Sequence, residues 1–551
     1  MADRDTTKGA TQGTAGDEKQ QERKPATGHE EDIVGKAYDG RLMRRLLTYL
    51  RPYKWQAAVS LIAILLKAGA DILGPYLTKV AVDHYMTGQD AAHAGHTSWL
   101  ARHLSANAAH GITEIAFIYL GALCFSYVLE FVQTYLMQWT GQKIMYDMRS
   151  EIFRHLQRMH IGFFDRNPVG RLVTRLTSDV DALNEMFTSG VFAIFEDVFV
   201  LLGIVVVMLR MSWWLALLSF AVLPVILLIT RVFRKHVRDS YRRIRTAIAR
   251  INSFTQEHVS GMSVVQLFGR EQRAYDDFAA VNRQHMVAFK DAILAYALYY
   301  PAVELLSSIA IALTIWMGGR GVLRNTVTIG VLVAFIQYAQ RFFRPIQDLS
   351  EKYNILQAAM ASSERVFKLL DTPPEVNSPE SPQRTARAGR IEFRDVWFTY
   401  ARLTPEQQAR IAAASPEELE AMAFGVSEET PDTIEWILRG VSFTVEPDQT
   451  AAIVGHTGAG KTTIISLMMR FYDVQHGQVL IDGVDVREHD LTELRRHFGV
   501  VLQDPFLFTG TIAENIRLDT DSIPDERLGR ATEEVKVVGF VRALPWGLDA
   551  P

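Results

Sequence analysis

The chain has 551 residues, of which 48% are hydrophobic and only 22% are charged. With a mean hydropathy of +0.04 it is too apolar to be disordered as a whole. The formal net charge of -4 gives no sign of a nucleic-acid partner, and we expect none. The single cysteine, Cys124, excludes an internal disulfide framework and any multi-cysteine metal site.

The N-terminal segment is polar and differs from the rest of the chain. The first 32 residues contain no Val, Ile, Leu, Phe, Tyr or Trp, so we predict a disordered tail over residues 1–36. Residues 37–370 are then predicted to form a helical transmembrane domain. Its apolar segments lie at about 57–83, 112–138, 190–209, 213–230, 292–317 and 328–345. Several reach the ~20 residues that cross a bilayer, so the sequence predicts six crossings.

Lysine and arginine are distributed unevenly between the connections of these segments. The connections 139–188 and 231–290 are long and rich in both residues, whereas 88–111 holds only Arg102. The positive-inside rule therefore places both termini in the cytoplasm. The two long connections have helical spacing, and each is interrupted once, at Asn167–Gly170 and at Ser260–Gly261. We interpret them as two cytosolic coupling hairpins, each with a break at its tip.

Several charged residues lie at membrane depth. Such side chains usually face the interior of a helix bundle or a cavity that holds water. Pairing between helices that only fixes their packing is the alternative, and the sequence leaves both open. The residues are Lys67, Asp71, Glu130, Glu196, Asp197 and Glu304.

The pattern changes after a Pro/Ser/Arg-rich linker at 371–390. Residues 391–551 alternate like a soluble α/β domain, with predicted strands at 391–400, 437–445 and 450–454. The last of these runs directly into Gly455-His-Thr-Gly-Ala-Gly-Lys-Thr462, a complete G-x-x-x-x-G-K-T loop. A helix at 462–472 is predicted to follow the loop.

This loop is a strong signal for nucleotide binding. Its glycines let backbone N–H groups turn onto phosphate oxygens at the positive end of a helix. Lys461 is then expected to reach the β- and γ-phosphates, and Thr462 to place its hydroxyl on Mg²⁺. Asp482 also ends an apolar run, but Gly483 follows it, so we interpret it as part of a hairpin. Gln503 follows the predicted strand residues 500–502, and a glutamine there can position water and metal.

Taken together, these motifs resemble an ATP-binding cassette (ABC) exporter half-transporter. Residues 163–181 and 261–271 resemble the two coupling loops of that family, and 362–371 resembles its exit from the sixth helix. Residues 503–515 resemble its Q-loop. Residues 75–83 and 349–357 are most similar to subunits of bacterial multidrug exporters, many of which are heterodimers.

The resemblance implies a fold, a site and a function. The fold is a six-helix transmembrane domain of the type I ABC exporter followed by an α/β P-loop NTPase domain. Lys461 and Gln503 would be catalytic, and Thr462 and Gln503 would hold Mg²⁺. ATP would bind Tyr400, which stacks on adenine, and Gly455, His456, Thr457, Gly458, Ala459, Gly460, Lys461, Thr462 and Thr463.

The implied activity is ATP-driven export of hydrophobic or amphipathic compounds of the multidrug type. The expected setting is a bacterial cytoplasmic (inner) membrane, with a second half-transporter as homo- or heterodimeric partner. Two alternatives stay open: a flippase for lipids or lipid-linked glycans, and a non-hydrolysing ATP-binding subunit of a heterodimer.

The sequence departs from the family pattern in three places. An insert at about 401–435 is Ala/Glu/Gln-rich, and its helix is predicted to start at Thr404-Pro405. Asp448 replaces a turn glycine, for which we expect little consequence. The signature and Walker B motifs of the family are not found before Pro551, so we expect the chain to be a C-terminally truncated part of a longer protein.

Overall fold

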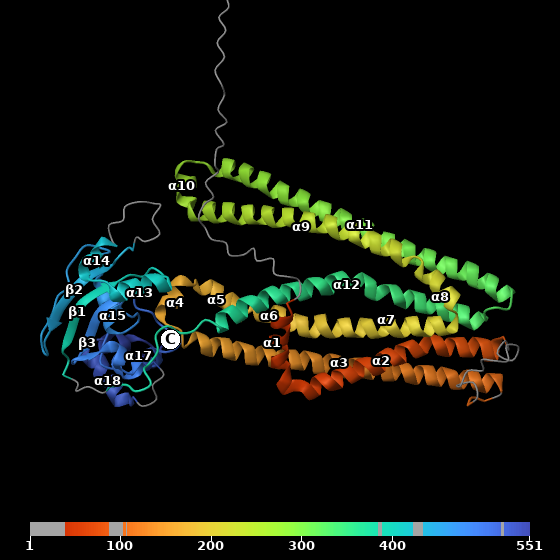
Figure 1. Cartoon of the computed structure of the whole chain (residues 1–551), viewed down its shortest axis with the longest axis horizontal. Coiled ribbons are helices and arrows are strands. Elements are labelled where there is room, and N and C mark those ends of the chain that lie inside the picture. Colours follow the sequence, from red (N-terminus) through yellow and green to blue (C-terminus); the bar gives the residue numbers. More distant parts are fainter. Residues whose placement is uncertain (1–38, 88–102, 106, 384–387, 423–433, 519–522) are drawn as a thin grey trace, which may run out of the picture. The chain divides into compact units, whose positions relative to one another are not determined.

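The computed structural model describes residues 39–87, 103–105, 107–383, 388–422, 434–518 and 523–551. The predicted tail at 1–36 lies outside these residues. The chain forms two compact units (Figure 1). The membrane unit takes in the described residues up to Gln157 together with Val169–Thr372. The nucleotide unit consists of Arg158–Pro168 and Pro373–Pro551.

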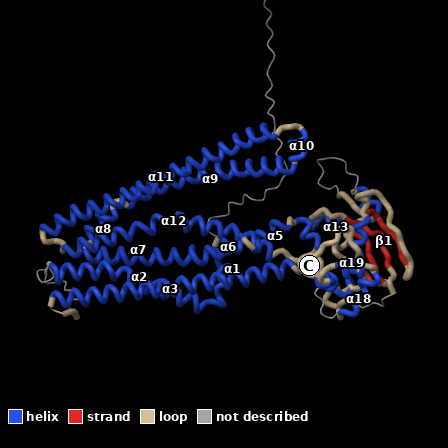
Figure 2. Tube along the Cα trace, turned by 180° about the vertical axis from the view of Figure 1, so that it is seen from behind, coloured by secondary structure: helices blue, strands red, loops and turns tan. Residues whose placement is uncertain are grey.

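Long helices make up the membrane unit, as the tube in Figure 2 shows. These helices run for up to 53 residues, and backbone groups that hydrogen-bond within one helix need no partner in lipid. The bounds are α1 Gly40–Leu50, α2 Lys54–Val80 with its π-helical extension η2 Ala81–Met86, α3 Ala108–Leu156, α5 Val169–Leu176, α6 Ser178–Glu185, the π-helix η5 Met186–Val191, α7 Phe192–Met211, α8 Trp213–Phe220, α9 Leu223–Ser260, α10 Met262–Leu267, α11 Glu271–Leu323 and α12 Ile329–Leu370.

Five continuous helical segments of the described chain are long and apolar enough to span a membrane: Gly40–Met86, Ala108–Leu156, Val169–Met211, Trp213–Ser260 and Glu271–Leu323. The sixth predicted crossing is a shorter apolar stretch, Ile329–Phe343, at the start of α12. Five of the six predicted spans are therefore long helices, and the last is apolar over 15 residues of a longer helix.

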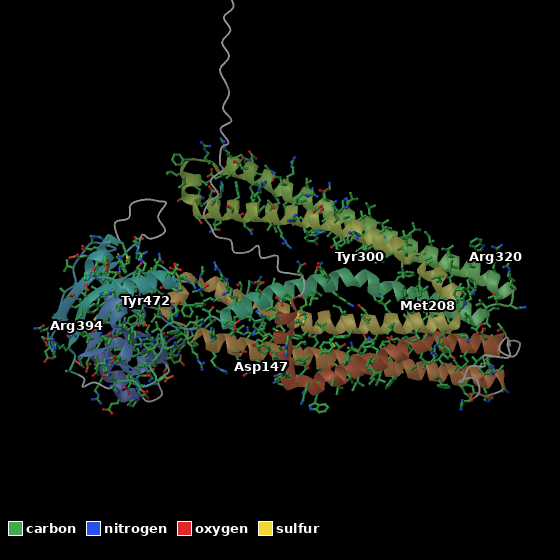
Figure 3. All side chains as sticks on the ribbon, viewed as in Figure 1. Asp147, Met208, Tyr300, Arg320, Arg394 and Tyr472 are labelled. Carbon is green, nitrogen blue, oxygen red and sulfur yellow. The ribbon has the colours of Figure 1, made fainter. Side chains whose placement is uncertain are left out.

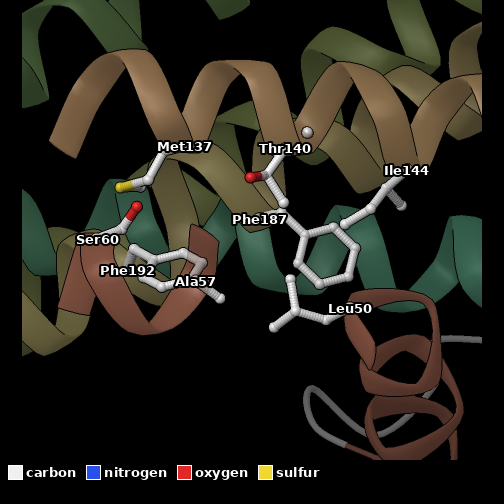
Figure 4. Close-up of a pocket in the computed structure, with 9 residues that line it drawn as sticks. Leu50, Ala57, Ser60, Met137, Thr140, Ile144, Phe187 and Phe192 are labelled. Atoms are coloured by element: carbon white, nitrogen blue, oxygen red, sulfur yellow. The ribbon is translucent and has the colours of Figure 1, made fainter. Parts of the chain in front are cut away.

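The apolar core of the membrane unit lies between α7, α8, α11 and α12. Met208, which Figure 3 labels, is fully buried in this core, as are Phe335 and Tyr338 of α12. A second, smaller contact joins α2, α3 and η5 around a cavity of about 10 Å³ (Figure 4). The buried hydroxyls of Ser60 and Thr140 line it and find no hydrogen-bond partner among the described residues. Such a volume has room for about one water molecule.

Most of the charged groups at membrane depth are paired between helices. Lys67 of α2 contacts Glu196 of α7 at 2.9 Å and Glu130 of α3 at 3.6 Å. Gln133 of α3 donates to the other oxygen of Glu196 at 3.0 Å.

Two further carboxylates at this depth also have partners. Asp71 accepts a hydrogen bond from Ser126 at 2.9 Å, and Asp197 pairs with Lys352. Glu304 on α11 is different, because it is exposed and makes no ion pair among the described residues. Interhelical pairing is thus observed for five of the six predicted residues.

A buried carboxylate joins the ends of α2 and α12. Asp83 in η2 is fully buried. It accepts hydrogen bonds from Thr328 Oγ1 and Gly330 N, each at 2.6 Å, and so caps the first turn of α12. Glycine is required at position 330, because a Cβ there would lie 2.5 Å from the carbonyl oxygen of Lys79.

The nucleotide unit contains an antiparallel sheet in the order β2-β1-β3-β4. The strands are β1 Ile391–Phe398, β2 Leu438–Val445, β3 His476–Ile481 and β4 Val484–Asp485. Its helices are α4 Ile161–Arg166, α13 Pro405–Ala413, α14 Pro416–Ala421, α15 Lys461–Met468, α16 Leu491–Arg495, α17 Ile512–Arg517, α18 Asp525–Glu534 and α19 Val538–Ala543. Phe393, Val396 and Phe398 of β1 pack against Ile464 and Leu467 of α15 to form its core.

The hairpin predicted at Asp482 is confirmed. Asp482 and Gly483 adopt φ of 52° and 83° between β3 and β4, and the Asp482 carboxylate accepts N–H bonds from residues 388–390. Asp482 therefore has a structural role. Asp448 adopts φ of 62°, a region that glycine adopts easily, which explains why the family has glycine at this turn. Aspartate tolerates this region better than most residues.

The predicted strand at 450–454 is wrong for the described chain, which forms no strand there. Val454 is 91% exposed and Val501, in the second apolar run, is 99% exposed. A strand needs a neighbour for its backbone hydrogen bonds, and the described sheet offers none to these two runs. The predicted helix at 462–472 is also shorter than expected and ends at Met468, since Arg470 adopts φ of 49°.

We predict that Gly330→Ala destabilises the membrane unit by roughly 1–3 kcal/mol, because the added methyl group must displace backbone. Asp83→Ala should cost about as much, since it leaves the Thr328 hydroxyl and the Gly330 N–H without an acceptor. Thermal unfolding of the detergent-solubilised chain measures both. Gly319→Ala on α11 is the matched control, because nothing lies within 4 Å of its added Cβ. Equal melting temperatures for Gly330→Ala and this control would contradict the capping role.

Candidate functional site

Two glycines give the loop at residues 455–462 its shape. Gly458 and Gly460 have φ of 87° and 80°, a region that residues with a Cβ rarely adopt. Gly460 is also the N-cap of α15, and a Cβ there would lie 2.7 Å from Leu438 Cδ2 of β2. The glycine spacing of the motif is therefore required by backbone conformation and by contact with the sheet.

The first turn of α15 offers free backbone donors. The first helical hydrogen bond runs from Ile464 N to Gly460 O at 3.1 Å. Among the described residues, no carbonyl accepts the N–H groups of Lys461, Thr462 or Thr463, as expected for a helix start. A row of N–H groups at the positive end of a helix suits an anion with several oxygen atoms.

The side chains of the loop add a cation and a hydroxyl. Lys461 Nζ donates to the carbonyl oxygens of Gly455 and His456 at 2.8 and 2.9 Å, so the ammonium group lies over the loop. Thr462 is exposed at the start of the helix. A compact cation beside free N–H groups fits the triphosphate of a nucleotide, and an exposed hydroxyl at this point is a suitable ligand for Mg²⁺.

An aromatic corner borders the loop. Tyr400, just past β1, is 41% exposed, and its hydroxyl contacts Thr463 Oγ1 at 3.0 Å. Its ring meets Phe398 and Tyr472 edge-to-face, at centroid distances of 4.7 and 5.1 Å. The structure thus joins Tyr400 to the phosphate-loop helix. The Thr463 hydroxyl makes this contact, and its expected role toward ATP stays a prediction.

The insert packs beside this corner and has its own small core. Its helix starts with a capping box between Thr404 and Gln407, which confirms the predicted start. Trp397 and Trp436 meet edge-to-face at 5.5 Å within the core that the insert forms. The insert therefore packs on Trp397 of β1, and Tyr400 keeps its contact with Thr463.

Gln503 does not take part in the hydrogen bonds described above. It lies exposed in a bend and, in the part of the chain that the structure describes, makes no hydrogen bond to the loop 455–462. The residues after it are ordered by Asn515, which exchanges hydrogen bonds with the backbone N–H and carbonyl of Phe508 at 2.7 and 2.9 Å. The expected metal and water-positioning role of Gln503 stays a prediction.

The sequence did not predict the role of Tyr472. The short helix α4 belongs to the nucleotide unit, and its Asp165 accepts a hydrogen bond from the Tyr472 hydroxyl. Gly162 of α4 lies against the same ring, since a Cβ at this glycine would be 3.1 Å from Tyr472 Cε1. Burial, together with the bond to Asp165, raises the pKa of Tyr472, so it is a neutral donor near pH 7. Figure 3 labels this residue.

Helix α4 contacts Tyr400 as well as Tyr472, because Arg166 donates to the Tyr400 carbonyl at 3.5 Å. A histidine completes the contact, because His160 Nδ1 accepts the Glu375 N–H at 3.2 Å and His160 Nε2 lies 3.1 Å from the carboxylate of the same residue. The only sequence signal for this contact was Tyr472, an aromatic residue at the end of the helix predicted at 462–472.

We predict that acid weakens the attachment of α4. Burial lowers the pKa of His160, so the folded unit favours the neutral ring. A group whose pKa is lowered on folding stabilises the fold above its ordinary pKa of about 6.5. That stability is lost as the pH falls from there toward the lowered pKa. Hydrogen exchange of residues 161–166 should therefore be faster at pH 5.5 than at pH 7.5, after correction for intrinsic rates.

His160→Gln is the control for this experiment, because glutamine keeps an acceptor and does not titrate in this range. Corrected exchange in this variant should be nearly independent of pH. An equal acid response in both proteins would assign the effect to another group.

Comparison with known proteins agrees with the geometry. The family described as "ABC transporter transmembrane region" matches residues 58–346, and the family described as "ABC transporter" matches residues 438–545. The first match covers more than half of the chain. The chain belongs to the ABC transporter family. The resemblance inferred from the motifs is confirmed, as is a helical membrane domain followed by an ATP-binding domain in one chain.

Three relatives illustrate the range of this family. The chain is 32% identical over 447 residues to the "Probable multidrug resistance ABC transporter ATP-binding/permease protein YheH" of Bacillus subtilis, covering 80% of this chain and 61% of the relative. It is 32% identical over 420 residues to the "Fatty acid ABC transporter ATP-binding/permease protein" of Mycobacterium bovis, covering 76% and 62%. It is 30% identical over 511 residues to an "ATP-dependent lipid A-core flippase" of Thiobacillus denitrificans, covering 92% and 79%.

Proposed function

We propose that the chain is one half of a bacterial exporter that uses ATP to move hydrophobic or amphipathic compounds across the cytoplasmic membrane. One observation carries the proposal: a glycine-shaped phosphate loop with Lys461 over it lies in the same chain as helices long enough to cross a membrane. The names of the relatives include drugs, fatty acids and a glycolipid among the cargoes, and all of these are hydrophobic or amphipathic. Multidrug export is the form that we propose first.

The chemistry follows from the residues of the loop. MgATP, when bound, supplies the phosphoryl group whose transfer to water provides the free energy. The N–H groups of residues 461–463 would hold phosphate oxygens, and Lys461 would offset the charge that develops on them. Thr462 would supply a hydroxyl to Mg²⁺. Gln503 would position water and metal at the bound nucleotide.

A second half-transporter is the partner that we propose. Each of two chains would bring one phosphate loop, and ATP binding would favour one arrangement of the pair over another. Movement of the nucleotide units would then open a substrate cavity, formed by the membrane units of the two chains, to alternate sides of the membrane. Flipping of lipids or lipid-linked glycans, and a regulatory role without hydrolysis, are the alternatives that measurements of cargo and turnover would distinguish.

Lys461→Ala should weaken MgATP binding by roughly tenfold or more, because the triphosphate loses a charge-assisted hydrogen-bond donor. Titration with a fluorescent ATP analogue measures this. Lys536→Asn is the matched control: Lys536 is exposed in the same unit with φ of 59°, a conformation that asparagine tolerates. Unchanged affinity in Lys461→Ala would remove the nucleotide assignment.

The expected topology has its own test. In a Cys124→Ser background, Leu323→Cys should react with a membrane-impermeant maleimide from outside the cell, because the turn after α11 is predicted to be external. Phe268→Cys, in the connection between α9 and α11, should react only after the membrane is opened. Both native side chains are well exposed, at 87% and 69%, so accessibility within the fold does not bias the comparison. Reversed labelling would invert the proposed orientation.

A further inference from the structure

A basic groove lies between two helices of the membrane unit, away from the phosphate loop. Helices α9 and α11 run side by side in both Figure 1 and Figure 2. The groove between them has a volume of about 950 Å³. This volume is at the upper end of the range for small-molecule sites, about 300–1,000 Å³. Its charged lining consists of Arg242, Arg243 and Arg250 on α9, and Asp276 and Arg283 on α11.

Small side chains form the floor of the groove. Ala247 and Ala288 are buried at 6% and 5% exposure, and Ala288 packs with Ile244 and Ala292. Alanine fills little space, so the two helices leave a channel above this floor. On α9, positions 242 and 250 are eight residues apart, about 12 Å along the helix axis, and therefore share one face. The arginines thus line the groove from both helices.

The charges of the walls are unbalanced. Arg243 forms a salt bridge to Asp291 at 2.8 Å, and Arg250 donates to the Gln284 side-chain oxygen at 3.0 Å. Among the described residues, the guanidinium groups of Arg242 and Arg283 make neither an ion pair nor a hydrogen bond to a protein group, although the Arg242 carbonyl accepts from Thr246 Oγ1 at 3.2 Å. Four arginines face one aspartate in the lining, and like charges held on facing helices repel. An anion placed between the two helices would remove this repulsion.

We propose that this groove binds a ligand that carries phosphate, held between Arg242 and Arg250 of α9 and Arg283 of α11. A phosphate bears up to two charges and three acceptor oxygens, and the planar guanidinium group pairs with it through two parallel hydrogen bonds. The channel is long enough for two phosphate groups, or for one phosphate and a polar head.

The ligand can have one of two sources. A free polyphosphate reaches the groove from the cytosol. The phosphorylated head of a lipid reaches it from the membrane, about 18 Å along α9 from the end of the apolar stretch at Thr230. If the ligand is a lipid, the groove would be a binding site for an anionic amphiphile that the protein exports. That interpretation rests on the proposed export function. Binding of phosphate itself does not depend on it.

The test measures binding of two soluble probes by titration calorimetry. They are inorganic tripolyphosphate and dihexanoyl phosphatidic acid, with dihexanoyl phosphatidylcholine as the comparison without net charge. The detergent-solubilised full chain carries Lys461→Ala, which weakens the contribution of the phosphate loop. Arg242→Ala combined with Arg283→Ala removes the two unpaired groove arginines. Arg245→Ala combined with Arg273→Ala is the matched control, since both residues are exposed on the same helices outside the groove.

At least one phosphate probe should bind, more weakly as salt is raised, and the groove double variant should lose roughly tenfold or more in affinity. The control double variant should stay within about twofold of the background, since equal net charge is removed without touching the groove. Tripolyphosphate binding identifies a soluble ligand, and binding of phosphatidic acid alone identifies a lipid head. No binding of either probe, equal binding of phosphatidylcholine, or equal losses in both double variants would overturn the proposal.

The result is separable from the proposed function. With Lys461 intact, the groove double variant should bind a fluorescent ATP analogue as tightly as the parent chain. Loss of that binding in Lys461→Ala alone tests the phosphate loop, and loss of tripolyphosphate or phosphatidic acid in the groove variant alone tests the groove.

Discussion

Hydrocarbon offers no hydrogen-bond partner, so each polar group at membrane depth must be satisfied inside the protein. The membrane unit meets this constraint by pairing helices that are distant in sequence. Lys67 of α2 is shared between Glu196 of α7 and Glu130 of α3, and the second oxygen of Glu196 is taken up by Gln133. The same requirement fixes the end of α2, where the Asp83 carboxylate closes the first turn of α12.

Glu304 is a charged residue at membrane depth for which the described part of the chain offers no ion-pair partner. It lies in the apolar part of α11, beyond the charged residues of the groove, and is exposed without an ion pair in the described chain. An isolated carboxylate at the centre of a membrane helix costs about 2.5–3.5 kcal/mol on insertion scales. A polar surface outside the described residues would remove this cost. The position of Glu304 is thus one physical reason to expect that α11 faces water or a second subunit.

Features that depend on near neighbours in sequence could be predicted. The phosphate loop requires glycines at two positions of positive φ within eight residues, and the helix start at Thr404 needs only Gln407, three residues on. Long apolar stretches likewise predicted the helices. The run at 450–454 looks like a strand by composition, but a strand also needs a neighbour from elsewhere in the chain, and its own residues do not reveal whether one is present.

The contact of α4 could not be predicted for the same reason, because Asp165 and Tyr472 are 307 residues apart. This contact connects the phosphate loop, through a few side chains, to α4. In the sequence, α4 lies between α3 and α5 of the membrane unit. Asp165 accepts from Tyr472, the Tyr472 ring touches Tyr400, and the Tyr400 hydroxyl contacts Thr463, two residues after Lys461. Contacts alone do not establish coupling, which requires two arrangements that both sites bias. Within the nucleotide unit they place two tyrosines between Thr463 and Asp165, and these are the contacts whose arrangements a test of coupling would compare.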